Sequence, residues 1–165
     1  MTTLFVDSNN VCYRGWWALR NLTTEKGEHT GMELGFFQIL LRLARTYSTM
    51  KIALVWDGVP VQRVTLYQKY KEKVFASHRE KEEHESFVRR MHVLRRVCSN
   101  ICDTYYDQHL EADELVARVV NNLREKVHKG SLHHAALFTS DEDWFGLVDS
   151  PSCFLIKPEK KGDQI

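Results

Sequence analysis

The sequence predicts an α/β domain with a central, twisted and mostly parallel sheet. Short apolar, β-branched or aromatic runs recur along the chain, and longer segments with apolar residues at helical spacing lie between them. Strands that alternate with helices of this length imply right-handed crossover connections. A chain of 165 residues with 43% hydrophobic content is long enough for one core and too short for two, so we expect a single domain over residues 1–165.

Five short apolar, β-branched or aromatic runs are predicted to be strands, the first, second and fourth of them buried on both faces. In chain order they cover residues 3–7, 51–57, 102–107, 134–141 and 152–157. Helical patterns cover residues 31–48, 84–100 and 111–129. In the last of these, six apolar residues form one stripe: Leu115, Val116, Val119, Val120, Leu123 and Val127.

The charge of the chain is nearly balanced but unevenly distributed. Lys and Arg number 23 against 22 Asp and Glu, so the net charge of +1 gives no global attraction to nucleic acid or membranes. Residues 69–96 hold nine Lys or Arg and five Glu, a net +4, which leaves 14 cations and 17 acids, a net −3, for the rest. We therefore expect a basic segment facing an acidic body.

The cysteines and the hydropathy pattern indicate the compartment. Four cysteines show no C-x-x-C spacing and no paired framework, which favours reduced thiols in the cytoplasm and speaks against a zinc site. The N-terminus has no basic flank, and no run of about 18 apolar residues occurs. We expect a cytoplasmic protein that does not contact membranes.

Carboxylates stand where the buried strands are predicted to end. Asp7, Asp57 and Asp141 each lie at such an end, and ligands of open parallel sheets bind beyond the carboxyl ends of the strands. Like charges this close raise each other's pKa unless a cation neutralises them. Four further acids join this edge, three of them in the first turn of the helix over 111–129: Glu111, Asp113, Glu114 and Asp143.

This set of ligands predicts the cation and the chemistry. Carboxylate oxygens without His or Cys favour Mg²⁺, with Mn²⁺ as a substitute, over zinc. Two such ions, about 4 Å apart, activate a water and stabilise the leaving oxygen of a phosphodiester. The prediction is metal-assisted hydrolysis of nucleic acid.

Helix capping is the alternative explanation for each acid taken alone. Asp7 and Asp57 fit turn formers or helix caps, and Asp141 fits an N-cap followed by first-turn acids. The acids around Glu111 complement a helix dipole in the same way. Their conjunction at one edge of one sheet is less easily explained by capping, and it favours the cation site.

Basic and aromatic residues that could handle phosphate follow two of these acids. Arg14 comes seven residues after Asp7, so a short helix would point it back to the crevice. Arg63, Tyr70 and Lys71 are spaced to share one helical face. Arg and Lys bind phosphate, and Tyr stacks on bases, although a solvated basic face remains the alternative.

These motifs occur together and in order: LFVDSNNVCYRG, TGMELGFFQILLRL, ALVWDG, RVTLYQKYK, HLEADELVARVV and FTSDEDWFGLV. In this arrangement residues 3–157 resemble the catalytic PIN-like domain of the 5′ nuclease and flap endonuclease family, especially its tailed-phage branch. The resemblance implies a three-layer domain with a helical arch at residues 72–95, through which a single-stranded 5′ end passes.

The implied activity is magnesium-dependent removal of 5′ flaps or RNA primers and 5′ to 3′ degradation of DNA, in replication and repair. Its substrate would be DNA with a 5′ end or flap, or an RNA/DNA hybrid. By motif, Arg14 and Lys71 match the residues that contact the scissile phosphate, flanked by Arg63 and Tyr70. The metal-site acids match Asp7, Asp57, Glu111, Asp113, Glu114, Asp141 and Asp143.

Three departures from the family pattern modify these expectations. Val74 stands where the family has Arg, so either Lys73 substitutes for it or the contact is absent, and Glu114 stands where aspartate is usual. The family's helix-three-turn-helix module, which grips duplex DNA and adds acids to the second metal site, is expected to be absent. We therefore expect an incompletely held second ion and a separate duplex-binding partner.

Two other functions remain open at this stage, a PIN-type endoribonuclease that cuts single-stranded RNA and a non-catalytic domain that binds nucleic acid or a replication partner. We expect a monomer, in the host cytoplasm if a phage encodes it.

Overall fold

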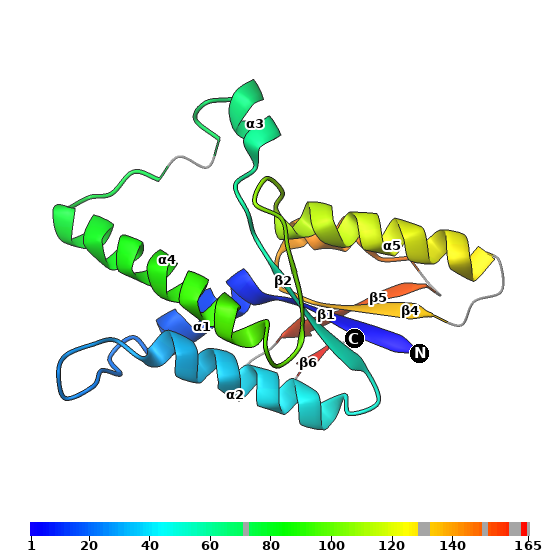
Figure 1. Cartoon of the computed structure of the whole chain (residues 1–165), viewed down its shortest axis with the longest axis horizontal. Helices are drawn as coiled ribbons and strands as arrows, with labels where there is room; N and C mark the ends of the chain where they lie inside the picture. Colours follow the sequence, from blue (N-terminus) through cyan, green and yellow to red (C-terminus); the bar gives the residue numbers. More distant parts are fainter. Residues whose placement is uncertain (71–72, 129–132, 150–151, 159–162, 165) are drawn as a thin grey trace.

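Six strands form one sheet in the order β3-β2-β1-β4-β5-β6 (Figure 1). The computed structural model describes residues 1–70, 73–128, 133–149, 152–158 and 163–164. The first five strands pair in parallel and the last is antiparallel to its neighbour. The strands are β1 (Thr2–Asp7), β2 (Lys51–Trp56), β3 (Asp103–Tyr106), β4 (His134–Phe138), β5 (Cys153–Pro158) and β6 (Asp163–Gln164).

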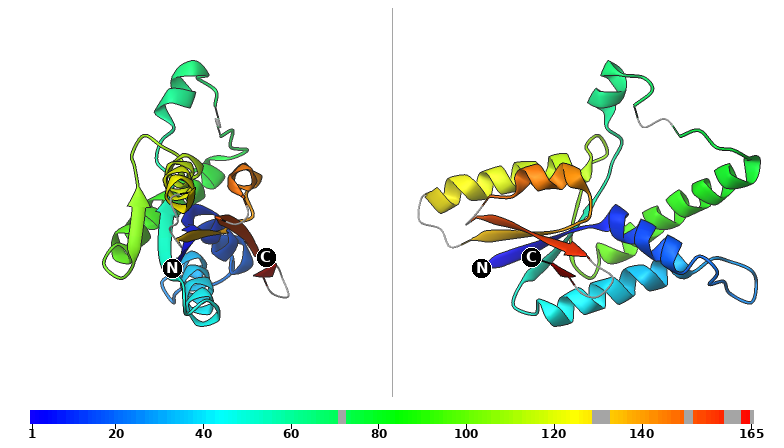
Figure 2. Two further views of the ribbon diagram at one scale, coloured as in Figure 1. Left: turned by 90° about the vertical axis from the view of Figure 1, so that its right-hand side faces the viewer. Right: turned by 180° about the vertical axis from the view of Figure 1, so that it is seen from behind.

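Helices cover both faces of this sheet. The helices are α1 (Ser8–Ala18), α2 (Gly31–Thr46), α3 (Val61–Leu66), α4 (His78–Cys98) and α5 (Ala112–His128), with a short 3₁₀ helix, η1 (Glu142–Leu147). The views in Figures 1 and 2 agree in placing α2 and α5 on opposite faces. Helices α1 and α4 lie on the α2 side, and η1 lies beside α5. The architecture is therefore the expected three layers.

Alternation along the strands builds two separate cores. Leu4 and Val6 of β1 face α1, α2 and α4, whereas Phe5 between them faces α5 and η1. The central strands β2, β1 and β4 bury both faces, which explains their unbroken apolar sequence.

Helices α1 and α2 pack closely through two glycines. A Cβ at Gly35 would lie 2.5 Å from the Cα of Gly15, so only a residue without a side chain fits there. This contact fixes α1 against the body, and α1 in turn starts at the end of β1 and carries site residues.

The five predicted strands are confirmed as a parallel sheet, with differences at their edges. The fourth strand ends at Phe138, before Asp141, because the chain turns there into η1. Helix α4 begins at His78, capped by the Ser77 side chain, rather than at residue 84. The antiparallel strand β6 had no sequence signal. In the part of the chain that the structure describes, no helix combines the length and apolar character needed to cross a bilayer.

Candidate active site

The topology brings the carboxyl ends of β1, β2 and β4 together, because these strands are neighbours in the sheet. A cavity of about 330 Å³ lies at this edge. It is bordered by the first turns of α1 and α5 and by the start of η1. Its lining residues are Asp7, Asn9, Asn10, Tyr13, Asp57, Gly58, Lys73, Glu111, Asp113, Asp141, Asp143 and Trp144.

Asp7 is the most buried carboxylate of the site, with 5% of its surface exposed. It caps α1 by accepting the Asn10 N–H at 3.0 Å, and it accepts the Thr139 hydroxyl at 2.7 Å. Burial, followed by the charges of Asp57 and Asp141, raises the pKa of Asp7 to about 7 despite these hydrogen bonds. The site thus holds an acid that is costly to ionise without a nearby cation.

Asp57 connects three elements at the mouth of the cavity. Its side chain accepts the Ala112 N–H at 2.8 Å, which caps the start of α5. Its own N–H donates to the Asn9 side chain at 3.2 Å, so α1 and the end of β2 are tied together. The capping and the site interpretations of this residue are therefore compatible.

Asp141 and Asp143 enter from the turn after β4. Asp141 caps η1 by accepting the Asp143 N–H at 3.1 Å, and its own N–H donates to Thr139 Oγ1 at 2.9 Å. Both carboxylates are exposed, as is Glu142 between them, but only Asp141 and Asp143 line the cavity. Buried Trp144 anchors this turn against the α5 face of the sheet.

The acids of α5 are held by an arginine from α3. Arg63 donates through Nη1 to Glu111 Oε2, and its Nη2 lies 3.2 Å from Asp113 Oδ2 and 3.5 Å from Glu114 Oε1. Tyr70 donates to the same Glu111 oxygen at 3.0 Å. The hydrogen bond to Tyr70 and then, against the cost of burial, the contacts with Asp113 and Glu111 raise the pKa of Arg63 further, so it stays charged.

The donor set of the cavity fits a hard divalent cation, because it consists of carboxylate and amide oxygens around an acid with a raised pKa. Among the described residues, no group of three or more His, Cys, Asp or Glu side chains is placed to hold a metal. The acids are instead engaged by helix N-termini, Thr139 and Arg63.

The basic residues that the sequence suggested for phosphate binding differ in their position relative to the cavity. Arg63 and Tyr70 reach the acids rather than open space, and Lys73 lines the cavity. Arg14 lies on α1, is half-buried, and does not line the cavity. Lys71 lies outside the described residues, as does Glu72 at the start of the expected arch.

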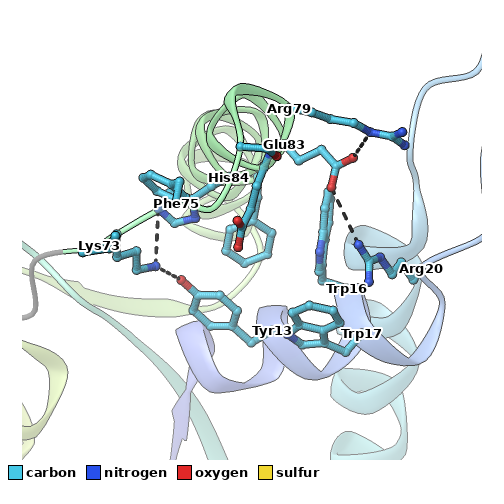
Figure 3. A pocket seen from close by; sticks show the side chains of 13 residues that line it. Tyr13, Trp16, Trp17, Arg20, Lys73, Phe75, Arg79, Glu83 and His84 are labelled. Atoms are coloured by element: carbon cyan, nitrogen blue, oxygen red, sulfur yellow. Dashed lines mark hydrogen bonds and ion pairs between the residues drawn. The ribbon is translucent and has the colours of Figure 1, made fainter.

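A second cavity of about 770 Å³ opens between α1 and the start of α4, and Lys73 lines both cavities (Figure 3). Lys73 Nζ lies 2.9 Å from the Tyr13 hydroxyl and 3.3 Å from His84 Nε2. Burial and then Lys73 lower the pKa of His84, which favours a neutral ring that accepts this hydrogen bond. Tyr13 and His84 together hold the Lys73 side chain between the two cavities.

The rest of this second cavity is aromatic and charged. Trp17 is 61% exposed, and the guanidinium of Arg20 lies 5.0 Å from its ring centroid. Arg20 and Arg79 both pair with Glu83, as the dashed contacts in Figure 3 show. Exposed aromatic rings beside cations are suited to single-stranded nucleic acid.

Several residues of the site had not been singled out in the sequence. Asn9, Asn10 and Tyr13 follow Asp7 on the first turns of α1, and Thr139 bridges Asp7 and Asp141. The adjacent amides in DSNN and the hydroxyl one residue after β4 were the available signals. They are common helix-start and turn residues, so only the sheet topology assigns them to the site.

Fold and site together define an α/β domain with acids gathered at the carboxyl edge of its sheet, as expected of a nuclease that cleaves phosphodiesters. Comparison with known families agrees. The family described as the 5′-3′ exonuclease, N-terminal resolvase-like domain, matches residues 2–164. The chain therefore belongs to this family of 5′-3′ exonucleases.

Curated relatives are bacterial DNA polymerases. The chain is 27% identical over 148 residues to DNA polymerase I of Deinococcus radiodurans, covering 90% of this chain and 14% of that protein. It is 27% identical over 164 residues to the thermostable DNA polymerase I of Thermus thermophilus, covering 94% of this chain and 18% of that protein. The chain thus spans less than a fifth of either polymerase.

Solved structures of bacteriophage T5 proteins share the fold. The T5 5′-exonuclease with bound zinc matches with a TM-score of 0.73 at 17% identity, over 99% of this chain and 58% of that one. A T5 D15 flap endonuclease variant in complex with DNA and metal ions matches with a TM-score of 0.69 at 17% identity, over 98% of this chain and 56% of that one. At this identity the likeness establishes the fold.

Proposed function

We propose that this chain is the catalytic domain of a magnesium-dependent 5′ to 3′ exonuclease or flap endonuclease that hydrolyses DNA, or RNA primers, in replication and repair. The observation that carries the proposal is the convergence of Asp7, Asp57, Glu111, Asp113, Asp141 and Asp143 on one cavity. Family membership and the metal ions bound in the T5 structures support it.

Bound divalent cations would supply an activated water and charge stabilisation for the leaving oxygen. The six cavity acids would hold them, with Glu114 next to the site. Asn9 and Thr139 keep Asp57, Asp7 and Asp141 in place through their hydrogen bonds. The residues of the chain thus bring together several negative charges whose mutual repulsion a bound cation would offset.

Substrate is proposed to lie across both cavities. Lys73, held by Tyr13 and His84, would take a phosphate near the acids, together with Lys71 and Arg14. The second cavity would guide the single-stranded 5′ end with aromatic rings and cations, so the segment from residue 72 to 95 serves as the arch.

Asp141→Asn tests the site, with Glu142→Gln as the matched control because both carboxylates lie in the same exposed turn and only Asp141 lines the cavity. End-labelled flap DNA, single-stranded DNA and RNA are incubated with each protein in Mg²⁺, Mn²⁺ or EDTA. We expect cleavage from the free 5′ end, dependent on metal, reduced about tenfold or more in Asp141→Asn and retained in Glu142→Gln.

Cleavage that persists unchanged in Asp141→Asn would reject the site assignment. Internal cuts in RNA without a need for a 5′ end would identify the PIN-type endoribonuclease instead. Nucleic-acid binding without turnover in any metal would identify a non-catalytic domain.

A further inference from the structure

Arg63 occupies the side of the site where α5 presents its acids. Its two terminal nitrogens reach Glu111, Asp113 and Glu114, and Tyr70 adds a second donor to the Glu111 oxygen. The Glu111 side chain is only 8% exposed, so this charge is largely removed from solvent. One fixed cation therefore neutralises part of a cluster of three carboxylates.

Helix α3, which carries Arg63, has little other attachment to the body. None of its residues is buried, and Leu66 is 88% exposed. The chain is anchored just before the helix, where the Gly58 and Val59 N–H groups bond to Leu110 and Gln108. Among the contacts that the structure describes for α3 and Tyr70, those of Arg63 and Tyr70 reach the acids at the start of α5, and the chain is anchored again where Lys73 meets Tyr13 and His84. Between these two anchors α3 can shift if the contacts of Arg63 are replaced.

The same carboxylates would be needed by a divalent cation. Glu111 and Asp113 line the acidic cavity, and Arg63 contacts both of them. A guanidinium keeps its proton, so Arg63 leaves these acids only by moving away. Arg63 contacts Oε2 of Glu111 and Oδ2 of Asp113, and a cation that binds the same two oxygens competes with it.

We infer that Arg63 is an internal counter-ion that competes with the divalent cation for Glu111, Asp113 and Glu114. Cation binding displaces Arg63 and releases α3 and Tyr70 toward the substrate, where the guanidinium can bind a phosphate. The inference rests on the proposed function, since it concerns the same acids. It makes occupancy of the metal site and placement of the phosphate-binding segment parts of one equilibrium.

Cation affinity in the absence of DNA tests this competition. Metal-stripped wild type and Arg63→Gln are titrated with Mg²⁺ by calorimetry, and their thermal unfolding is followed in EDTA and in Mg²⁺. We expect Arg63→Gln to unfold at a lower temperature in EDTA, to bind Mg²⁺ about fivefold or more tightly, and to gain more stability from Mg²⁺ than wild type does.

Arg118→Gln is the control, because it removes one charge from the exposed side of the same helix α5. A comparable rise in its affinity would mean that net charge alone explains the effect and would overturn the inference, as would an Arg63→Gln affinity no higher than wild type. If Arg63→Gln does not fold in EDTA, Arg63→Lys takes its place, since lysine keeps the charge but cannot bridge three carboxylates.

The two proposals fail separately. Unchanged Mg²⁺ affinity in the Arg63 variants, with cleavage that depends on Asp141, removes the competition alone. Absence of cleavage by wild type in any metal removes the proposed function, and the calorimetric comparison still decides whether Arg63 competes.

Discussion

At the scale of single residues, ionisation of the buried Asp7 side chain lowers the free energy of unfolding. Its pKa is raised from 3.8 to about 7, so the unfolded chain releases this proton first as the pH rises. The stability from the protonated folded form is complete below about pH 4 and is lost as the pH rises through about 7. Three pKa units correspond to about 4 kcal/mol in the free energy of unfolding.

Asp7→Asn should remove this dependence. The quantity to follow is the free energy of unfolding of the variant minus that of wild type, measured by urea unfolding at each pH in EDTA. We expect this difference to rise by roughly 2–4 kcal/mol in favour of the variant from pH 4 to pH 8. Mg²⁺ at pH 8 should narrow the gap, because it stabilises only the ionised acid. Glu142→Gln, which changes an exposed side chain in the neighbouring turn that does not line the cavity, should show no such trend. A gap that is constant with pH would contradict the raised pKa.

At the scale of secondary-structure elements, Gly58 sets how the end of β2 meets the start of α5. A Cβ at this position would lie 1.9 Å from the Asp107 carbonyl oxygen, and 2.9 Å from that of Leu110. Both are backbone atoms, so Gly58→Ala must displace the loop before α5. That loop positions Glu111 and the Ala112 N–H that bonds to Asp57.

We expect Gly58→Ala to lose stability of about 2 kcal/mol, or roughly 4–8 °C in Tm, and to lose cleavage and Mg²⁺ binding together. The measurements are thermal unfolding, nuclease assay and calorimetry. Gly146→Ala is the matched control, because a Cβ there meets nothing within 4 Å although η1 borders the same site. Equal effects in the two variants would show that the α5 loop is not specifically involved.

The elements differ in how well their sequence specified them. The bounds of the buried strands were predicted within a few residues, because a short run of consecutive apolar residues is typical of a strand that is buried on both faces. Helix α1 was less evident, since its polar first turn is built from site residues and its buried residues are few. Arg63 and Tyr70 were expected on one helical face, but α3 ends at Leu66 and a turn after it brings Tyr70 back to Arg63. The sequence predicted a shared helical face for phosphate binding, and it predicted neither the turn after Leu66 nor the acidic partners of Arg63.

At the scale of the whole molecule, the site depends on which strands are neighbours. The sequence placed acids at strand ends, but only the order β2-β1-β4 brings Asp7, Asp57 and Asp141 to one edge. Pairing of Asn9 with Asp57 spans 48 residues, and that of Thr139 with Asp7 spans 132, so no local pattern could reveal them. The same acids cap helices and line the cavity, because in this topology the carboxyl ends of the strands lie beside the N-termini of the helices.

The charge distribution of the whole molecule gives the last prediction. With a net charge of +1, affinity for DNA must come from where the cations lie rather than from their number. Lys73 and Arg79 line the second cavity, on the proposed strand path, whereas Arg42 and Arg45 line a separate cavity of about 360 Å³ on α2. Each pair carries two charges, so the pairs can be compared directly.

Binding of fluorescent single-stranded DNA is measured over a range of salt concentrations in EDTA. For Lys73→Gln with Arg79→Gln, we expect weaker binding and a slope of log K against log salt that is shallower by about 1.4, because each lost phosphate contact on a single strand removes roughly 0.7. For Arg42→Gln with Arg45→Gln, the slope should match wild type. Equal changes in both double variants would mean that the strand responds to total charge, and the second cavity would lose its role as the path of the 5′ end.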